Sequence, residues 1–180
     1  PYEVVVRREA HGSYLKRAPH FTKGHIFPKL VLEFFLKTNG KKWKEHDLVC
    51  DDPYMIHEAD GKAIYLYDPK LPSLAQAPAS SFLTLNENDV FTQKNEEELI
   101  EEMGVIARQT FLVLEKAWQL QGRKLVDFKV EFGIDCEGKL LLADVIDNDS
   151  WRVVDGDGGY MDKQVYRDGG SLDEVTAKYR

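Results

Sequence analysis

One alternating stretch sets the architecture of this chain: Leu125-Val126-Asp127-Phe128-Lys129-Val130-Glu131-Phe132. The even-numbered residues of this stretch are apolar, while Asp127, Lys129 and Glu131 alternate with them. Alternation with a period of two predicts a β-strand that buries one face and presents charges on the other. The charged face is either a charge-balanced, solvated surface or the floor of a cleft. Three charges in a row, backed by an apolar face, favour the cleft.

A hairpin is expected after this strand. The chain continues into a second apolar run, Leu140–Ile146, and Glu137-Gly138 suits a two-residue turn between the two. That turn, or a four-residue loop, sets Glu131 opposite Asp144, whereas a three- or five-residue loop sends the two carboxylates to opposite faces. Facing carboxylates are destabilising unless a cation lies between them. The pair is therefore either an Mg²⁺ site that also holds phosphates, or a solvated sheet edge where the carboxylates turn apart.

The remaining elements indicate an α+β fold. Strands are predicted within Glu3–Glu9 and Phe27–Lys37, and the proline after Asp52 favours an extended backbone at that residue. A long core helix is predicted to begin after Asn95, as its N-cap, and to end by Gly122. Because strands do not simply alternate with helices, we expect a mainly antiparallel sheet with packed helices.

Composition limits the classes of function. The 180 residues are 43% hydrophobic, and 24 basic against 31 acidic residues give a net charge of −7, which disfavours general nucleic-acid binding. No apolar run approaches the ~20 residues of a membrane helix. Only Cys50 and Cys136 are present, which indicates free thiols and a cytoplasmic setting. The five histidines show no metal-ligand spacing.

Cationic residues are spread along the chain. Arg7 precedes the flexible Gly12-Ser13 turn, and Arg152 follows Asp149-Ser150-Trp151. Lys163 and Arg167 are four residues apart, so a helix would place both on one face, where a phosphate could lie between them. Guanidinium groups suit bidentate binding of phosphate or carboxylate. Each residue alone is best explained as a surface ion pair, and the set becomes an anion site only in a fold that gathers it.

Four blocks, in order along the chain, carry a resemblance to a known family. They are Val5–Arg8 with Gly12–Arg17, then Leu125–Gly133, then Leu142–Arg152, and finally Asp162–Arg167. These blocks resemble the SAICAR synthetase (phosphoribosylaminoimidazole-succinocarboxamide synthase) family of purine biosynthesis. The resemblance implies the larger lobe of an ATP-grasp-like fold.

The activity that the resemblance implies is an ATP-dependent ligation. L-Aspartate is joined to carboxyaminoimidazole ribonucleotide (CAIR) through an acyl phosphate, giving SAICAR, ADP and phosphate. The implied partners are these small molecules, with neither nucleic acid nor membrane, and a homo-oligomer is compatible with the chain. Two other functions stay open: a non-catalytic sugar-phosphate-binding or assembly module, and another ATP-grasp-like small-molecule kinase.

The resemblance also implies roles for individual residues. Glu131 and Asp144 hold Mg²⁺ on ATP, and Lys129 serves the ATP phosphates or the reacting carboxylate. Asp127 orients the aspartate amine or accepts its proton. The implied substrate-binding residues are Arg7, Ser13, Lys37, Asp52, Asp149, Arg152, Lys163 and Arg167.

One organisation of the chain follows from the resemblance. Residues 1–180 form a single substrate- and metal-binding lobe, with an extended loop insertion at residues 54–92. The amino-terminal ATP lobe of the family, with its phosphate-covering loop, is expected to be absent from these residues.

Overall fold

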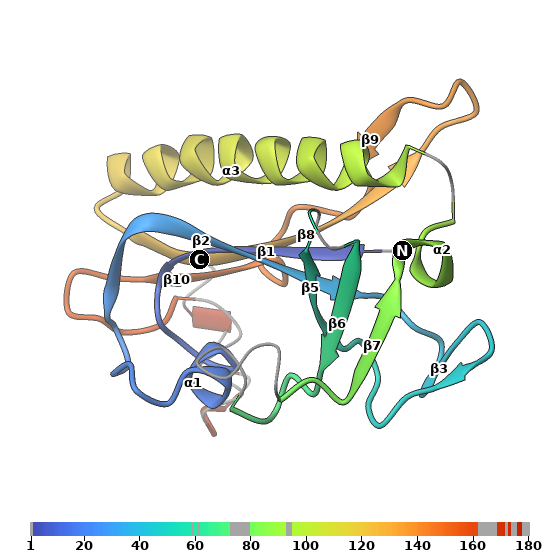
Figure 1. Cartoon of the computed structure of the whole chain (residues 1–180). Helices are drawn as coiled ribbons and strands as arrows, with labels where there is room; N and C mark the ends of the chain where they lie inside the picture. Colours follow the sequence, from blue (N-terminus) through green and yellow to red (C-terminus); the bar gives the residue numbers. More distant parts are fainter. Residues whose placement is uncertain are drawn as a thin grey trace.

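The structure is a computed structural model, and it describes residues 2–58, 60, 62–72, 80–92, 95–161, 169–171, 173 and 176–177. One antiparallel sheet forms its centre, with strand order β10-β8-β1-β2-β5-β6-β7 and β9 paired with β8 (Figure 1). The strands of this sheet are β1 (Tyr2–Glu9), β2 (Ile26–Leu36), β5 (Tyr54–Glu58), β6 (Ala63–Tyr67), β7 (Leu83–Asn86), β8 (Lys124–Ile134), β9 (Leu140–Leu142) and β10 (Trp151–Val154). A separate hairpin comprises β3 (Lys42–Trp43) and β4 (His46–Asp47). The helices are α1 (Tyr14–Arg17), α2 (Glu87–Val90) and α3 (Glu96–Leu120). The predicted α+β class is confirmed.

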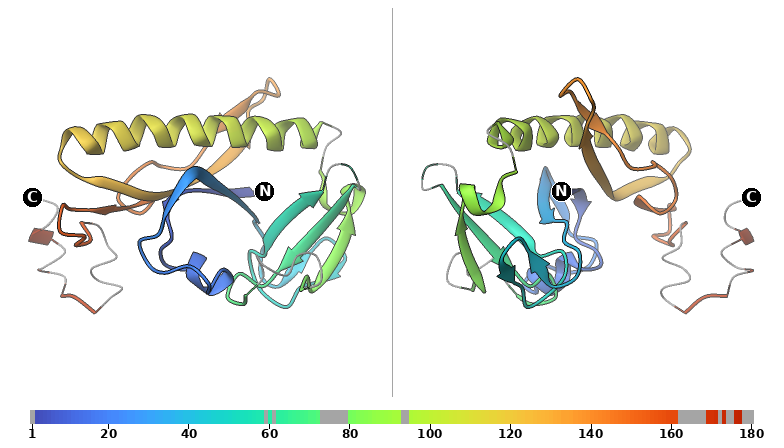
Figure 2. Two further views of the ribbon diagram at one scale, coloured as in Figure 1. Left: turned by 60° about the vertical axis from the view of Figure 1, so that its left-hand side comes forward. Right: turned by 90° about the vertical axis from the view of Figure 1, so that its right-hand side faces the viewer.

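The central strands have one apolar and one charged face, as the alternating stretch predicts. In the β1–β8 register Val4 pairs with Val130 and Val6 with Phe128, and all four side chains are buried. They pack beneath α3, which lies across this face of the sheet (Figures 1 and 2). The alternate positions of the same strands point to the other side, which we call the polar face.

Helix α3 is the principal cover of the core. It follows Asn95 and ends before Gly122, which adopts a φ of +67°, so both predicted boundaries are confirmed. The predicted side-chain cap is wrong, because the Asn95 side chain makes no capping hydrogen bond. Glu96 is buried instead, where it accepts hydrogen bonds from the Tyr2 hydroxyl and from Thr92. The bond from Tyr2 joins the start of α3 to the first residue of the central strand β1.

The β8–β9 register differs from the predicted hairpin. Phe132 pairs with Leu142, and Asp135 N–H donates to the Lys139 carbonyl at 3.0 Å, so the loop has three residues rather than two or four. The Asp135 carboxylate accepts from the backbone N–H groups of Glu137 and Lys139, each at 2.9 Å, which stabilises the odd-numbered loop. The predicted pairing of Glu131 with Asp144 is therefore wrong: the Glu131 carbonyl accepts from Ala143 N–H at 3.0 Å.

Residues 54–92, predicted as an extended loop insertion with one short strand at Ala63–Tyr67, contain that strand and further regular elements. Their described parts contain β5, β6, β7 and α2, and the three strands extend the central sheet. The segment Tyr54–Glu58 pairs with Ala63–Tyr67 residue by residue, so the two strands bury Met55 and Leu66 in the core. Within the residues that the structure describes, no helix has the length and apolar character that crossing a membrane requires.

Candidate functional site

The polar face gathers charged side chains from three neighbouring strands. In the β1–β8 register Glu3 lies opposite Glu131, and Arg7 lies opposite Asp127. Strand β2 contributes Glu33, which pairs with Val5 of β1. Side chains on alternate residues of paired strands share a face, so these groups project together on the side of the sheet away from α3.

A cavity of about 190 Å³ opens on the polar face. Strands β1, β8 and β10 line it, together with the turn before α1 and the loop before β10. Six of the predicted site residues are among its lining residues: Arg7, Ser13, Asp127, Lys129, Asp149 and Arg152. The fold therefore brings together residues that are up to 145 positions apart, from Arg7 to Arg152.

A buried chain of ion pairs reaches this cavity through Arg7, Asp127 and Arg152. Arg7 donates through Nε to Glu33 and through Nη1 to Asp127, each at 2.5 Å, and only 3% of the Arg7 side chain is exposed. Arg17 donates to the other oxygen of Glu33 at 2.6 Å, and Arg152 donates to Asp127. Three guanidinium groups thus alternate with two carboxylates.

The ionisation of this chain follows from its geometry. Burial alone raises the pKa of Glu33, but the adjacent guanidinium groups of Arg7 and Arg17 hold that pKa below its ordinary value of 4.5. Burial acts to lower the pKa of Arg7, and the carboxylates of Glu33 and Asp127 more than offset it, so this pKa is raised. Glu33 and Arg7 are therefore both charged at neutral pH.

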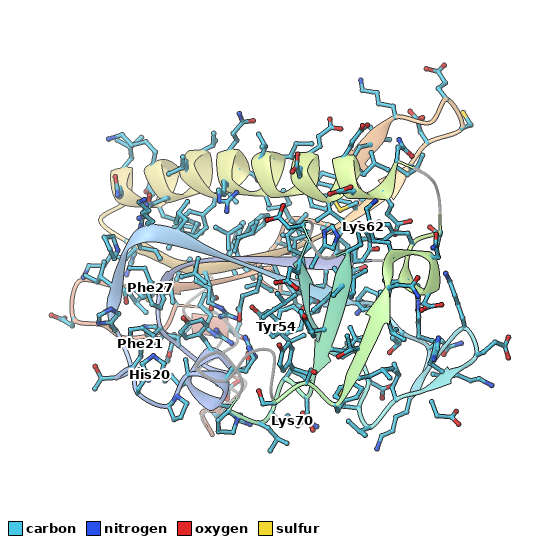
Figure 3. The ribbon with its side chains drawn as sticks, in the orientation of Figure 1. His20, Phe21, Phe27, Tyr54, Lys62 and Lys70 are labelled. Atoms are coloured by element: carbon cyan, nitrogen blue, oxygen red, sulfur yellow. The ribbon has the colours of Figure 1, made fainter. Side chains whose placement is uncertain are left out.

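Sequence reasoning did not single out Glu33. The available signal was its place as the one charged residue in the apolar run Leu30–Leu36, since a charge inside a buried strand requires a partner. In the structure Glu33 is 1% exposed and holds both Arg7 and Arg17. Arg17 also lies over the ring of Tyr54, which projects from β5 (Figure 3).

Gly12 fixes the position of Arg152 from the other side. Its φ is +55°, and a Cβ atom on Gly12 would come within 2.5 Å of Arg152 Nη2. Only glycine permits this approach, because any other side chain would collide with the guanidinium and would adopt the left-handed region at a cost. Arg152 is thus held between the Gly12-Ser13 turn and Asp127.

An aromatic group lies in the segment after α1, where the Phe21 ring contacts the rings of His20 and Phe27 (Figure 3).

A second cluster lies beside the cavity and joins two lysines to four carboxylates. Lys129 Nζ is 3.5 Å from Glu3 and 3.9 Å from Asp144. Lys37 Nζ is 2.9 Å from Asp52, 3.5 Å from Glu131 and 4.0 Å from Glu3. The predicted residues Lys37, Asp52, Lys129, Glu131 and Asp144 therefore form one contiguous group. Asp144 reaches Lys129 despite the slipped register because it lies beyond the last residue of β9.

Asp52 departs from the predicted extended backbone, since its φ is +44°. Three hydrogen bonds with Thr38 and Lys37 hold this conformation. The Asp52 carboxylate accepts from Thr38 N–H at 2.8 Å and from Lys37 Nζ at 2.9 Å, and Asp52 N–H donates to the Thr38 hydroxyl at 3.0 Å. A strained backbone retained at a polar cluster is typical of functional sites.

The donor set of this cluster fits Mg²⁺. The side chains of Glu131 and Asp144 are 36% and 38% exposed, so their carboxylate oxygens are accessible, and each contacts a lysine rather than an apolar group. Mg²⁺ prefers hard oxygen ligands and is commonly held by one or two carboxylates together with substrate phosphates. Lys163 and Arg167, the remaining predicted site residues, lie outside the described residues.

An antiparallel sheet with one face covered by a helix and with cationic and carboxylate groups clustered on the other defines an α+β protein with a charged, polar candidate site. The family model described as SAICAR synthetase matches residues 76–180. The chain belongs to the SAICAR synthetase family.

Curated relatives extend the similarity along almost the whole chain. It is 37% identical over 169 residues to the phosphoribosylaminoimidazole-succinocarboxamide synthase of Roseiflexus sp. (strain RS-1). The matched region covers 93% of this chain and 53% of that protein. It is 41% identical over 169 residues to the bifunctional purine synthesis protein purC/E of Dictyostelium discoideum, covering 93% of this chain and 14% of that protein. The chain thus spans about half the length of the Roseiflexus relative.

Solved structures show the same arrangement. A SAICAR synthetase (Type-2) in complex with ADP is 28% identical with a TM-score of 0.61, and the match covers 97% of this chain and 59% of that one. The phosphoribosylaminoimidazole-succinocarboxamide synthase of Ehrlichia chaffeensis is 26% identical with a TM-score of 0.63, covering 100% of this chain and 60% of that one.

Proposed function

We propose that this chain forms the substrate- and metal-binding lobe of a cytoplasmic, ATP-dependent carbon–nitrogen ligase of purine biosynthesis. The ligase joins L-aspartate to CAIR and gives SAICAR, ADP and phosphate. The observation that carries the proposal is the cavity on the polar face, which collects six separately predicted residues in a chain of this family. In this proposal the ATP-binding lobe of the ATP-grasp-like architecture lies outside these 180 residues, in keeping with relatives about twice as long.

The cavity suits a substrate with a phosphate and carboxylates. Arg152 and Lys129 present cationic groups to it, and Ser13 adds a hydroxyl donor. The side chains of Arg152 and Lys129 are 16% and 38% exposed, so both are accessible to a ligand. Guanidinium binds such anions in bidentate fashion, which also orients them. Asp149 lines the same cavity, and Lys163 and Arg167 are proposed as further substrate contacts.

Arg7 and Asp127 act mainly by holding Arg152. The Arg7 guanidinium is almost fully enclosed and paired with Glu33 and Asp127, so it anchors the Asp127 carboxylate. Asp127 then accepts from Arg152 and fixes its direction. Asp127 also lines the cavity, where it could orient the attacking amine of aspartate.

The lysine and carboxylate cluster serves the phosphoryl transfer. ATP phosphorylates the CAIR carboxylate, and the aspartate amine then displaces phosphate from the acyl phosphate, so negative charge accumulates on transferring oxygens. Lys129 and Lys37, which lie in one charged cluster, would stabilise that charge. Glu131 and Asp144 would hold Mg²⁺, which neutralises phosphate charge when bound. Asp52 keeps Lys37 in place.

A coupled assay of ADP release by the full-length protein tests the proposal. With MgATP present, we expect ADP release to require both CAIR and aspartate. The variant Arg152→Gln should raise the KM for CAIR at least about tenfold, since it removes charge-assisted hydrogen bonds worth ~1.5–3 kcal/mol. Arg108→Gln, an exposed arginine on α3, is the matched control and should leave the KM unchanged. Folded protein without aspartate-dependent ADP release refutes the ligase, and ADP release that ignores aspartate indicates a kinase.

A further inference from the structure

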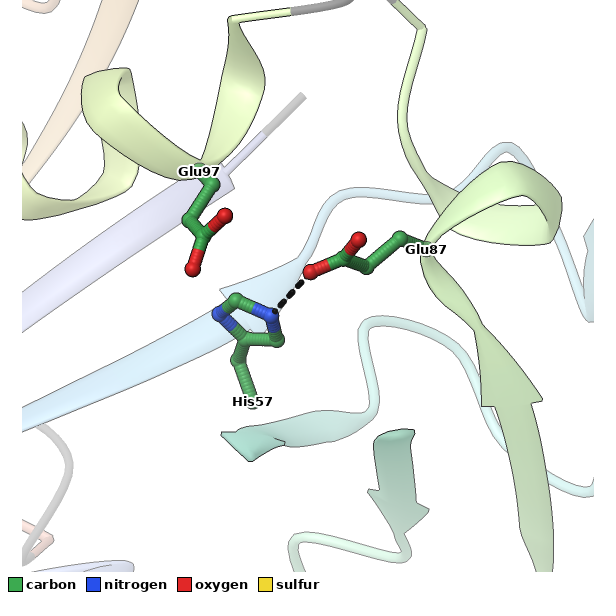
Figure 4. A group of neighbouring side chains, drawn as sticks. All are labelled: His57, Glu87 and Glu97. Carbon is green, nitrogen blue, oxygen red and sulfur yellow. Dashed lines mark hydrogen bonds and ion pairs between the residues drawn. The ribbon is translucent and has the colours of Figure 1, made fainter. Parts of the chain in front are cut away.

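A histidine and two glutamates from three separate elements converge away from the polar face. His57 belongs to β5, Glu87 begins α2, and Glu97 lies in the first turn of α3 (Figure 4). His57 is two residues from Met55, which belongs to the core under α3, so His57 points to the helix-covered side. One ring nitrogen of His57 and one carboxylate oxygen of each glutamate all lie within 4.8 Å of one another.

The immediate contacts of this group place two carboxylates close to one imidazole ring. His57 Nε2 is 3.0 Å from Glu87, and the two side chains are only 11% and 15% exposed. The Glu97 carboxylate lies on the other side of the imidazole and is half-buried (Figure 4). In the described part of the chain it makes no hydrogen bond or ion pair. Lys62 Nζ is 3.5 Å from Glu87, but the Lys62 side chain is 72% exposed and free to move away. Two carboxylates beside one imidazole thus offer three converging donor atoms to a metal ion.

We infer that His57, Glu87 and Glu97 bind a divalent transition-metal ion, with Zn²⁺ the best match. Imidazole together with carboxylate oxygens selects Zn²⁺ over Mg²⁺ and Ca²⁺, which prefer all-oxygen sites. Three protein ligands are enough for tetrahedral Zn²⁺, with water in the fourth position. Zn²⁺ bonds of about 2.0–2.2 Å place ligand atoms roughly 3.3–3.5 Å apart. From the present spacing of at most 4.8 Å, side-chain rotations that bring the ligand atoms up to about 1.5 Å closer achieve this.

The position of the site indicates a structural role. Metal bonds there join β5, the start of α2 and the start of α3, and so cross-link the segment of residues 54–92 to the helix that covers the core. A ligand that binds the folded state alone stabilises it. The site is separate from the proposed active site, because none of its three residues lines the cavity on the polar face. Its failure would leave the proposed ligase activity unaffected.

Titration of chelator-treated full-length protein with ZnCl₂, followed by calorimetry and by thermal unfolding, tests the inference. The wild-type protein should bind Zn²⁺ at this site and unfold at a higher temperature with Zn²⁺, whereas MgCl₂ should not replace it. Glu97→Gln and His57→Gln should each weaken this binding about tenfold or more. Glu98→Gln, exposed in the same turn, and His20→Gln, an exposed histidine, are matched controls and should bind as the wild-type protein does.

The Glu97→Gln variant decides the outcome. Glu97 has no hydrogen bond or ion pair to lose in the described structure, so this variant should fold even if His57→Gln does not. Weaker Zn²⁺ binding and a lost thermal shift in Glu97→Gln, with Glu98→Gln unaffected, support the site. Zn²⁺ binding by Glu97→Gln equal to that of the wild-type protein overturns it, as does a wild-type protein that binds no Zn²⁺.

Discussion

Asp127 and Gly12 both bear on the position of Arg152. The first accepts its hydrogen bond, and the second leaves the space that its guanidinium occupies. Neither contact involves an immediate sequence neighbour of Arg152. A change at either residue should therefore displace Arg152 and weaken substrate binding. Gly12 offers the cleaner test because it has no side chain of its own to lose.

Gly12→Ala should impair substrate binding beyond its effect on stability. The added Cβ displaces Arg152, so we expect the KM for CAIR to rise about tenfold, while the left-handed backbone costs about 1 kcal/mol of unfolding free energy. Gly40→Ala is the matched control, because Gly40 has a φ of +71° and a Cβ atom added there would meet no described atom within 4 Å. It should lose similar stability with an unchanged KM. Equal KM values for both variants would show that Gly12 does not position Arg152.

Glu33→Gln should destabilise the fold in a pH-dependent manner. Removing one carboxylate from a buried ion-pair chain costs about 3–5 kcal/mol of unfolding free energy at pH 7. The pKa of Glu33 is depressed in the folded state, so its contribution is fully present above the ordinary value of 4.5 and is lost as the pH falls below it. Urea unfolding between pH 7 and pH 3 should show the wild-type and variant curves converging in acid. A difference that stays constant with pH would contradict this.

At the scale of elements, α3 stabilises the sheet through one face only. Phe111 is fully buried, whereas Val113, two residues further on, is 70% exposed. Phe111→Ala should lower the unfolding free energy by about 3–5 kcal/mol, since it leaves a cavity beneath the helix. Val113→Ala should change it by less than about 0.5 kcal/mol. Chemical denaturation of both variants checks this, and a comparable loss in Val113→Ala would mean that the outer face of α3 is also packed.

The elements themselves could be predicted from local sequence pattern, but the way in which the strands pair could not. Period two in β8 and the helical period in α3 are properties of neighbouring residues, so both elements could be predicted, although β8 extends beyond the predicted Leu125–Phe132 at both ends, to Lys124–Ile134. The β8–β9 register could not, because the Asp135 side chain stabilises a three-residue loop over the two-residue turn that Glu137-Gly138 suggests. The extension of the sheet by β5, β6 and β7 likewise depends on pairing between segments.

At the scale of the whole molecule, the proposed phosphate site is assembled from distant segments. Glu3 and Lys129 come from β1 and β8, Lys37 follows β2, and Asp144 follows β9. All of these residues except Glu3 were predicted as candidates from the family resemblance: Lys129 and Asp144 lie within its blocks, and Lys37 lies between them. Their grouping into one cluster required the antiparallel order of β8, β1 and β2.

Glu131→Gln should separate function from folding in this cluster. In the full-length protein we expect aspartate-dependent ADP release to fall about 10²-fold or more, because the variant removes a proposed ligand of the charge-neutralising Mg²⁺. The unfolding free energy should change by less than about 0.5 kcal/mol, since the Glu131 side chain is partly exposed. Glu137→Gln, at the exposed tip of the same hairpin, should affect neither measurement. Near-normal turnover of Glu131→Gln would exclude Glu131 from the site.

Sequence alone was sufficient for the alternating strand, the long helix, the α+β class and the family blocks, because these are patterns within short windows. Four features required the tertiary structure: the slipped hairpin register, the left-handed backbone of Asp52, the burial of Glu33 between two arginines, and the convergence of His57, Glu87 and Glu97. Each depends on contacts that compete with a local preference or that join residues far apart in sequence. Their free energies arise from packing and charge compensation between elements, which spacing along the chain does not specify.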